Sequence, residues 1–155
     1  MNHDRALIDV ARRAIGALGL AAIALIHLLD IQSKWHETKY QFWLFVMLIV
    51  ASVVGAALLL GRRHKEGWWL AVGCSAAALV AYSLSRTTGL PSASDDVGNW
   101  LESLGLASLF VEGAVLLLSG YVLLESATRP LAAPDPSTAV ILDLSQASES
   151  LVAGG

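Results

Sequence analysis

Charged side chains are scarce in this sequence of 155 residues, since Asp, Glu, Lys and Arg together make up only 15% of it. A soluble domain carries about 25% charged residues, so this deficit, with a hydrophobic content of 55%, indicates a protein that resides in lipid. The single cysteine excludes an internal disulfide and any CxxC redox or zinc pair. With ten basic against thirteen acidic residues, the chain also lacks the basic excess that binds a nucleic acid backbone.

Four apolar runs are long enough to cross a bilayer, whose hydrocarbon core of about 30 Å needs roughly 20 apolar helical residues. They comprise residues 14–31, 41–61, 67–85 and 104–124. Membrane β-strands are excluded, because they show alternating rather than continuous apolar residues. We therefore predict an all-α fold in which residues 14–125 form an up-down, antiparallel bundle of four transmembrane helices. Residues 1–13 are expected to be an N-terminal flank, and residues 126–155 a disordered tail rich in Pro, Ala and Ser.

The lysines and arginines beside the spans predict the orientation of the bundle, because the positive-inside rule counts these residues and largely ignores acids. Seven fall on the side that holds both termini: Arg5, Arg12, Arg13, Arg62, Arg63, Lys65 and Arg129. Three fall on the opposite side: Lys34, Lys39 and Arg86. Both termini are therefore expected in the cytoplasm.

Tryptophans mark the ends of the predicted spans, which agrees with the preference of the indole ring for the membrane interface. Trp35 and Trp43 flank the outer start of the second span, Trp68 and Trp69 open the third at the inner face, and Trp100 precedes the fourth. Hydropathy, charge and aromatic placement thus predict the same four spans.

Glu112 is the most informative residue, because a carboxylate near the middle of a membrane helix costs about 2.5–3.5 kcal/mol on insertion scales. The Leu, Val and Phe residues of the same span contribute roughly 0.3–0.6 kcal/mol each and can offset this cost. Glu112 is therefore expected to face the bundle interior, where a partner or a proton neutralises it. Two interpretations stay open: a neutral acid that bonds within the bundle, for example to Ser108, or a functional group that binds an ion, a proton or a cationic group.

His27 lies about one turn from the outer end of the first span, and Asp30 follows three residues later on the same helical face. Asp30 would orient the imidazole or share a metal with it, although a lone histidine near a helix end is more often a satisfied interfacial group. Tyr82 is expected at the depth of His27, and Arg86 at the level of Asp30. Together with Glu112, these residues form a predicted polar site in the outer half of the bundle.

Imidazole and carboxylate groups are the donors that zinc, iron, manganese and copper prefer, so a divalent metal ion is one expected ligand. The metal-ligand candidates are His27, Asp30 and Glu112, with His36, Asp95 and Asp96 from the outer loops. No HExxH, ExxH or HxH spacing occurs, so the ligands would have to come from several helices. The alternative is a network in which Arg86 pairs with Asp30 or Glu112 while the outer acids are solvated.

The outer loop from Arg86 to Ser103 contains the turn-forming TTGLP and the acidic SDDVGNWLES, in which Ser94 is expected to cap a short helix along the membrane surface. The stretch YSLSRTTGLP, followed by Asp95, Asp96, Trp100 and then Glu112, resembles a segment of small four-helix bacterial membrane proteins that carry no assigned activity. The resemblance implies a bacterial plasma membrane and a connection between this loop and Glu112.

Three functional hypotheses follow from these residues. The leading one is a membrane protein whose outward-facing polar site, lined by His27, Asp30, Tyr82, Arg86 and Glu112, binds an ion, a proton or a small polar ligand. It would act as a sensor, a transporter component or an accessory subunit. The second is a structural subunit of a homo-oligomer or membrane complex. The third is an enzyme acting on a lipid or quinone with Glu112 and His27 as acid and base, which requires the first and fourth helices to be adjacent.

Overall fold

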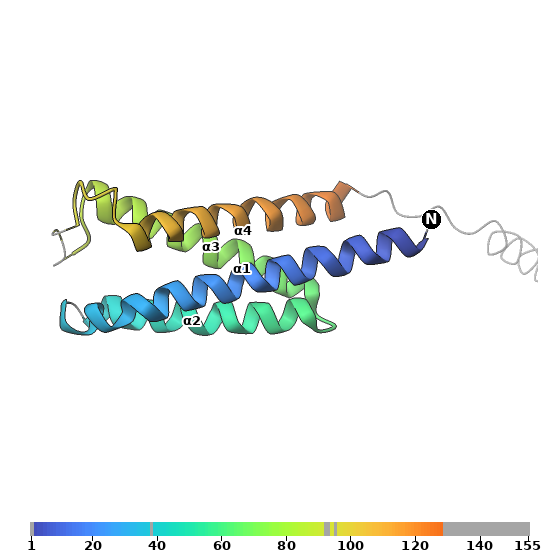
Figure 1. Cartoon of the computed structure of the whole chain (residues 1–155), viewed down its shortest axis with the longest axis horizontal. Coiled ribbons are helices and arrows are strands. Elements are labelled where there is room, and N and C mark those ends of the chain that lie inside the picture. The colour runs from blue at the N-terminus through green and yellow to red at the C-terminus, as the bar shows by residue number, and fades with distance from the viewer. Residues whose placement is uncertain (1, 38, 92–93, 95, 129–155) are drawn as a thin grey trace, which may run out of the picture. The chain divides into compact units, whose positions relative to one another are not determined.

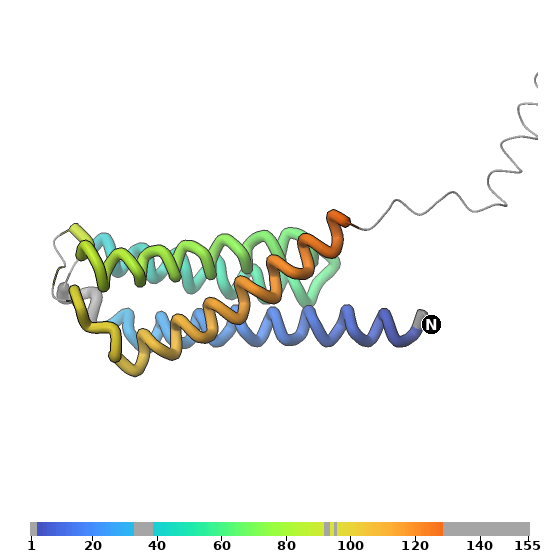
Figure 2. Tube along the Cα trace, turned by 90° about the horizontal axis from the view of Figure 1, so that it is seen from above, coloured from blue at the N-terminus to red at the C-terminus, as the bar shows by residue number. Residues whose placement is uncertain are grey.

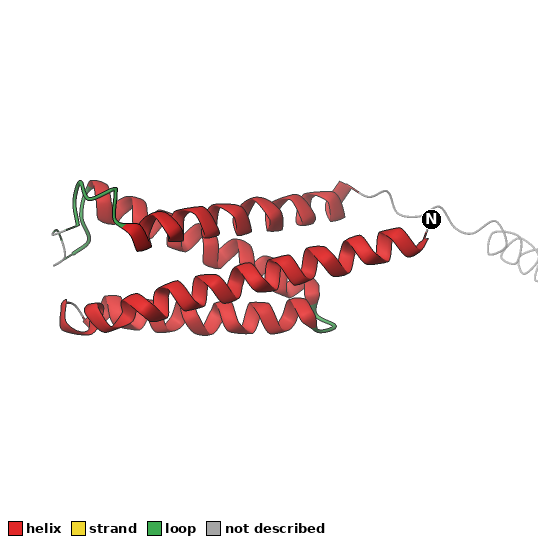
Figure 3. Cartoon of the chain, in the orientation of Figure 1, coloured by secondary structure: helices red, strands yellow, loops and turns green. Residues whose placement is uncertain are grey.

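The computed structural model describes residues 2–37, 39–91, 94 and 96–128, and these residues are helical apart from short connections (Figure 3). The helices are α1 (Asn2–Glu37), α2 (Lys39–Leu60), α3 (His64–Thr87) and α4 (Ser103–Thr128). Each of the four is long and apolar enough to cross a membrane. The predicted all-helical fold with four membrane-spanning helices is therefore confirmed at this level, and the described residues contain no strand.

Successive helices run in opposite directions (Figure 1). The start of α1, the turn between α2 and α3, and the end of α4 lie at one end of the bundle, which we call the turn end. The end of α1, the start of α2 and the loop of residues 88–102 lie at the other, which we call the loop end. α2 packs against both α1 and α3, while α4 crosses the opposite side of the bundle obliquely (Figure 2).

α1 is much longer than its predicted span. It has 36 residues and extends for about 54 Å at 1.5 Å per residue, well beyond the bilayer core of about 30 Å. Because the helix begins at Asn2, the predicted flank of residues 1–13 continues α1 without a break. Within this flank Arg13 forms an ion pair of 3.0 Å with Asp9, one turn earlier, which stabilises a solvated helical end.

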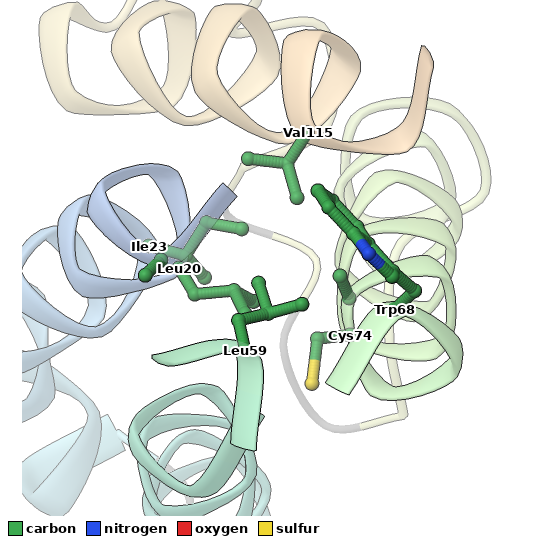
Figure 4. Packing of buried hydrophobic residues seen from close by; sticks show 8 residues of the cluster. Leu20, Ile23, Leu59, Trp68, Cys74 and Val115 are labelled. Atoms are coloured by element: carbon green, nitrogen blue, oxygen red, sulfur yellow. The ribbon is translucent and has the colours of Figure 1, made fainter. Parts of the chain in front are cut away.

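The hydrophobic core contains side chains from all four helices (Figure 4). Its labelled members are Leu20 and Ile23 of α1, Leu59 of α2, Trp68 and Cys74 of α3, and Val115 of α4. Small residues of α1 let its neighbours approach: a Cβ atom at Gly16 would lie only 2.7 Å from the ring of Trp68, and one at Gly19 would collide with Val115. This contact between Gly19 and Val115 holds α4 close to α1.

Trp68 lies near the start of α3, as expected, but its ring faces the interior of the bundle. Its side chain is only 3% exposed and belongs to the core, whereas the neighbouring Trp69 is 60% exposed. The large apolar ring fills the space that Gly16 leaves open on α1, and this packing outweighs the interfacial preference of its N–H group. Of these two residues, only Trp69 is placed as an interfacial tryptophan would be.

The expected surface helix after Ser94 is wrong for the residues that the structure describes in this loop. Positions 96–102 form turns, in which the Val97 N–H donates to the Ser94 carbonyl at 3.1 Å. Gly98 has a φ of 81°, a left-handed conformation that interrupts a right-handed helix. The Gly98 N–H also donates to the Arg86 carbonyl at 2.9 Å, which ties the loop to the end of α3.

Candidate functional site

Glu112 lies inside the bundle with its side chain directed to neighbouring groups and away from lipid, and it is only 1% exposed. The Ser108 hydroxyl, one helical turn earlier on α4, donates to Glu112 Oε1 at 2.5 Å. Nε2 of His27 on α1 lies 3.7 Å from the same oxygen. The other carboxyl oxygen, Oε2, has no hydrogen-bond partner among the described residues. Glu112 therefore has two polar neighbours at Oε1, while Oε2 remains an acceptor without a donor among the described residues.

His27 is held by contacts with three helices. Its Nδ1 donates to the Ile23 carbonyl at 3.0 Å, and because a carbonyl only accepts, the hydrogen must lie on Nδ1. Phe45 of α2 packs edge-on against the imidazole, with ring centroids 4.9 Å apart. These contacts direct Nε2 towards Glu112, at a separation longer than a direct hydrogen bond of about 2.7–3.2 Å. α1 and α4 are thus adjacent, as the acid and base hypothesis required.

A cavity of about 500 Å³ lies between the helices at the loop end and brings the sequence-derived candidates together. Four of the five residues of the predicted polar site line it: His27, Asp30, Tyr82 and Arg86. Glu112 lies directly behind the wall, where it contacts two residues that do line the cavity, His27 and Ser108. We call Glu112 and His27 together the floor of the cavity, of which His27 lines the space and Glu112 lies behind it.

The middle of the cavity wall is apolar. It is formed by Leu44, Phe45 and Leu48 of α2 and by Ala77, Ala78 and Ala81 of α3. The three alanines leave room that larger side chains would fill. The loop of residues 88–102 contributes polar groups to the wall, those of Asp96, Asn99 and Glu102, beside the apolar Leu90.

Arg86 organises the loop end of the cavity. Its side chain is 5% exposed, and its guanidinium group lies 2.6 Å from Asp96 Oδ1 and also contacts the Glu102 carboxylate. The same group stacks over the Tyr82 ring, 4.9 Å from the centroid. The interpretation in which Arg86 pairs with Asp30 or Glu112 while the outer acids are solvated is therefore corrected: the ion pairs of Arg86 are with Asp96 and Glu102, two of those acids, which the turns of the loop bring back to the guanidinium group.

Two tyrosines attach the loop to the helices below it. The Tyr40 hydroxyl at the start of α2 donates to the Pro91 carbonyl at 2.7 Å. The Tyr82 hydroxyl lies 3.4 Å from the Trp100 carbonyl, to which it donates, and the two aromatic rings meet edge to face. With the Arg86 ion pairs, these contacts hold the described residues of this loop, 88–91, 94 and 96–102, against the end of the cavity.

Gln41 is a cavity residue for which the sequence analysis had assigned no role. It is 6% exposed and lines the cavity, and its amide oxygen has no hydrogen-bond partner among the described residues. Its sequence signal is a polar residue at the first position of an otherwise apolar run. Arg86 Nε is a second buried polar atom on this wall without a partner. Such groups are costly to bury and indicate a missing partner.

The metal-ligand candidates do not converge in the part of the chain that the structure describes. Within it, no three His, Cys, Asp or Glu side chains gather closely enough to hold a metal ion. Glu112 and His27 meet as a pair, while Asp30 and Asp96 line the cavity. The side chains of His36 and Asp95 lie outside the described residues, so their expected roles stay predictions.

Comparison with known proteins gives no guide to the use of this cavity. No family model, curated protein or solved structure matches the chain. The function is therefore inferred from the cavity and the side chains around it.

Proposed function

We propose that this chain is a membrane protein that binds a small amphipathic ligand, with a polar head group on an apolar body, in the cavity at the loop end. The observation that carries the proposal is the cavity itself, which combines an apolar wall with buried polar atoms that lack partners. Small-molecule sites have volumes of about 300–1,000 Å³, mainly apolar walls and a few polar groups that orient the ligand. At about 500 Å³ the cavity meets each of these criteria.

We further propose that the loop end faces the outside of a bacterial plasma membrane. The turn end carries most of the positive charge: Arg5, Arg12, Arg13, Arg62, Arg63 and Lys65. By the positive-inside rule this end belongs in the cytoplasm, and the even number of antiparallel helices then brings both termini to the cytoplasmic side. The ligand would reach the cavity from outside the cell or from the outer leaflet.

In this proposal Glu112 and His27 form the functional floor of the cavity. Ionisable groups inside a membrane are costly and commonly mark ligand or proton pathways. One proton can be shared between Glu112 Oε1 and His27 Nε2 after a small approach of the two groups from 3.7 Å. His27 also lines the cavity, so a polar ligand there can exchange hydrogen bonds with the pair.

Binding to the cavity is testable with three probes that share one phenylbutyl body: 4-phenylbutylamine, 4-phenylbutanol and 5-phenylpentanoate. Isothermal titration of the full-length protein in lipid nanodiscs measures their affinities. Ala78→Phe fills the cavity, and Ala81→Phe is a second filler on the same helix. Val80→Phe, at an exposed position between them, adds the same ring outside the cavity.

At least one probe should bind saturably to the natural chain and to Val80→Phe. Both fillers should weaken that binding by about tenfold or more, because the added ring occupies the volume that the ligand needs. The proposal fails when no probe shows binding that depends on the fillers.

A structural subunit is the second candidate function, and two contacts between α1 and α4 favour it. Besides the pair of His27 and Glu112 in the middle, Arg12 forms an ion pair of 2.6 Å with Glu125 at the turn end. Polar side chains of this kind fasten membrane helices together without any ligand. In that case Glu112→Gln would reduce stability or co-purification of a partner, and probe binding would be insensitive to the fillers.

A further inference from the structure

The side chains around the cavity select the charge of its ligand. We propose that the ligand is an amphipathic organic cation: a protonated amine joined to an apolar or aromatic body. This inference rests on the proposed function, since it concerns the same cavity, and it deepens that function by naming the ligand class.

Negative charge exceeds positive charge among the described side chains that line the cavity. Three carboxyl groups, those of Asp30, Asp96 and Glu102, accompany one guanidinium group, that of Arg86. Arg86 already contacts two of these acids, so its charge is balanced within the wall. An anionic head group would be repelled by the excess of carboxylates, whereas a cationic one would be attracted to it.

The unpartnered atoms point to a ligand that donates hydrogen bonds. The Gln41 amide oxygen on the wall and Glu112 Oε2 in the floor are both acceptors, and both lack partners among the described residues. A protonated primary amine brings three N–H donors and no acceptor. Arg86 Nε, the unpartnered donor on this wall, lies in the group that the loop acids already hold.

The apolar wall requires an organic body rather than a bare ion. Leu44, Phe45 and Leu48 of α2 line the cavity together with the three alanines of α3. These side chains offer an inorganic cation no ligands, and its hydration shell would have to be removed against them. An alkyl or aromatic body instead buries apolar surface there, while its ammonium group reaches the acceptors. An alkylammonium or arylalkylammonium ion therefore matches both parts of the lining.

The three phenylbutyl probes test this inference, because they have the same apolar body and differ in the head group, which is cationic, neutral or anionic. At pH 7 the amine should bind about tenfold more tightly than the alcohol, since hydrogen bonds involving a charged group are the stronger ones, and the carboxylate should bind most weakly. Gln41→Leu removes the unpartnered acceptor and should reduce the preference for the amine over the alcohol by about threefold or more. Gln41→Glu adds a carboxylate and should increase that preference. Met47→Leu, on the exposed face of the same helix, is the control and should change neither affinity.

The outcomes separate the inference from the proposed function. When the alcohol or the carboxylate binds as tightly as the amine, and the fillers abolish that binding, the cavity binds ligands but the cation inference is wrong. When no probe shows binding that the fillers weaken, both fail. When the amine binds most tightly but Gln41→Leu and Gln41→Glu leave its preference unchanged, Gln41 is not part of the head-group site and the assignment of that acceptor is overturned.

Discussion

Nε2 of His27 on α1 lies 3.7 Å from Oε1 of Glu112 on α4, so a histidine and an acid from distant parts of the chain meet inside the bundle. The same carboxyl oxygen accepts the hydroxyl hydrogen of Ser108. The side chain of Val115 on α4 also lies against Gly19 of α1, so the two helices meet at an apolar contact as well as at this polar one. The side chains of His27 and Glu112 therefore serve two purposes: they connect α1 to α4, and they form the floor of the cavity.

A double-mutant cycle measures the contact between these two residues. His27→Ala and Glu112→Gln should be non-additive in the free energy of unfolding by about 0.5–2 kcal/mol, because residues in contact couple by this order. Unfolding in detergent micelles, followed by tryptophan fluorescence, gives the change in the free energy of unfolding for the two single variants and for the double variant. His64→Ala, at the exposed start of α3, is the matched control and should be additive with Glu112→Gln. If the effects were additive in both cycles, His27 and Glu112 would have no energetic coupling and the proposed contact would be wrong.

Ser108→Ala should lower stability, because it leaves Glu112 Oε1 without its hydroxyl donor. We expect a loss of about 1 kcal/mol, the order of one hydrogen bond in a protein or a membrane bundle. The control is Ser83→Ala, since Ser83 is exposed and donates only to the Leu79 carbonyl of its own helix. That change should cost less than about 0.5 kcal/mol. Equal effects of the two substitutions on thermal unfolding would show that the Ser108 hydroxyl does not support the carboxyl group.

Arg86→Lys should loosen the outer loop although it keeps the positive charge. Arg86 uses different guanidinium nitrogens to reach Asp96 and Glu102, and the single ammonium group of lysine cannot reproduce that planar fork. Loss of one charge-assisted hydrogen bond costs about 1.5–3 kcal/mol, which corresponds to amide exchange about tenfold or more faster in residues 96–102. Hydrogen–deuterium exchange measures this change. Arg62→Lys, in the exposed turn between α2 and α3, should leave the exchange of the loop unaltered.

Adjacent tryptophans should differ in their effect on stability. Trp68→Ala removes a buried ring from the core and should cost about 3–5 kcal/mol, whereas Trp69→Ala changes an exposed residue and should cost less than about 1 kcal/mol. Chemical unfolding of the two variants in the same detergent provides the comparison. Similar losses for both would contradict the assignment of Trp68 to the core and favour the interfacial position that the sequence suggested.

The number of the helices and the approximate limits of α2, α3 and α4 could be predicted from the sequence, because each depends on the residues of one helix, whereas α1 extends well beyond its predicted span at both ends. An apolar run of about 20 residues spans the bilayer whatever its neighbours are. Glu112 was recognisable in the same way, since an acid in such a run is costly wherever it lies. Even the bond to Ser108 was accessible, because the two residues lie one turn apart on α4.

Contacts between helices could not be predicted in this way. Hydropathy does not order helices around a bundle, so the meeting of His27 with Glu112 depended on a neighbour relation that only the structure provides. Trp68 and Trp69 have the same interfacial preference but point about 100° apart around the helix, and only packing against α1 determines which one faces the core. Gln41 carries no charge, so its burial gave no strong signal in the sequence.

The orientation of the bundle can be tested by labelling single cysteines in intact bacterial cells. Leu101→Cys places a thiol in the outer loop at a position that is 84% exposed, and Arg62→Cys places one in the exposed turn at the other end. The natural Cys74 is buried, so it should contribute little background. A membrane-impermeant maleimide should label Leu101→Cys in intact cells and Arg62→Cys only after permeabilisation, because the positive turn end belongs in the cytoplasm.

The opposite labelling pattern would place the cavity on the cytoplasmic side. Labelling of both thiols in intact cells would indicate two orientations in the membrane, and the excess of Arg and Lys at the turn end is expected to prevent this. Either result would overturn outward access to the cavity. Neither would alter the chemistry of its lining, since the acids around Arg86 and the floor at Glu112 belong to the bundle whichever way it is inserted.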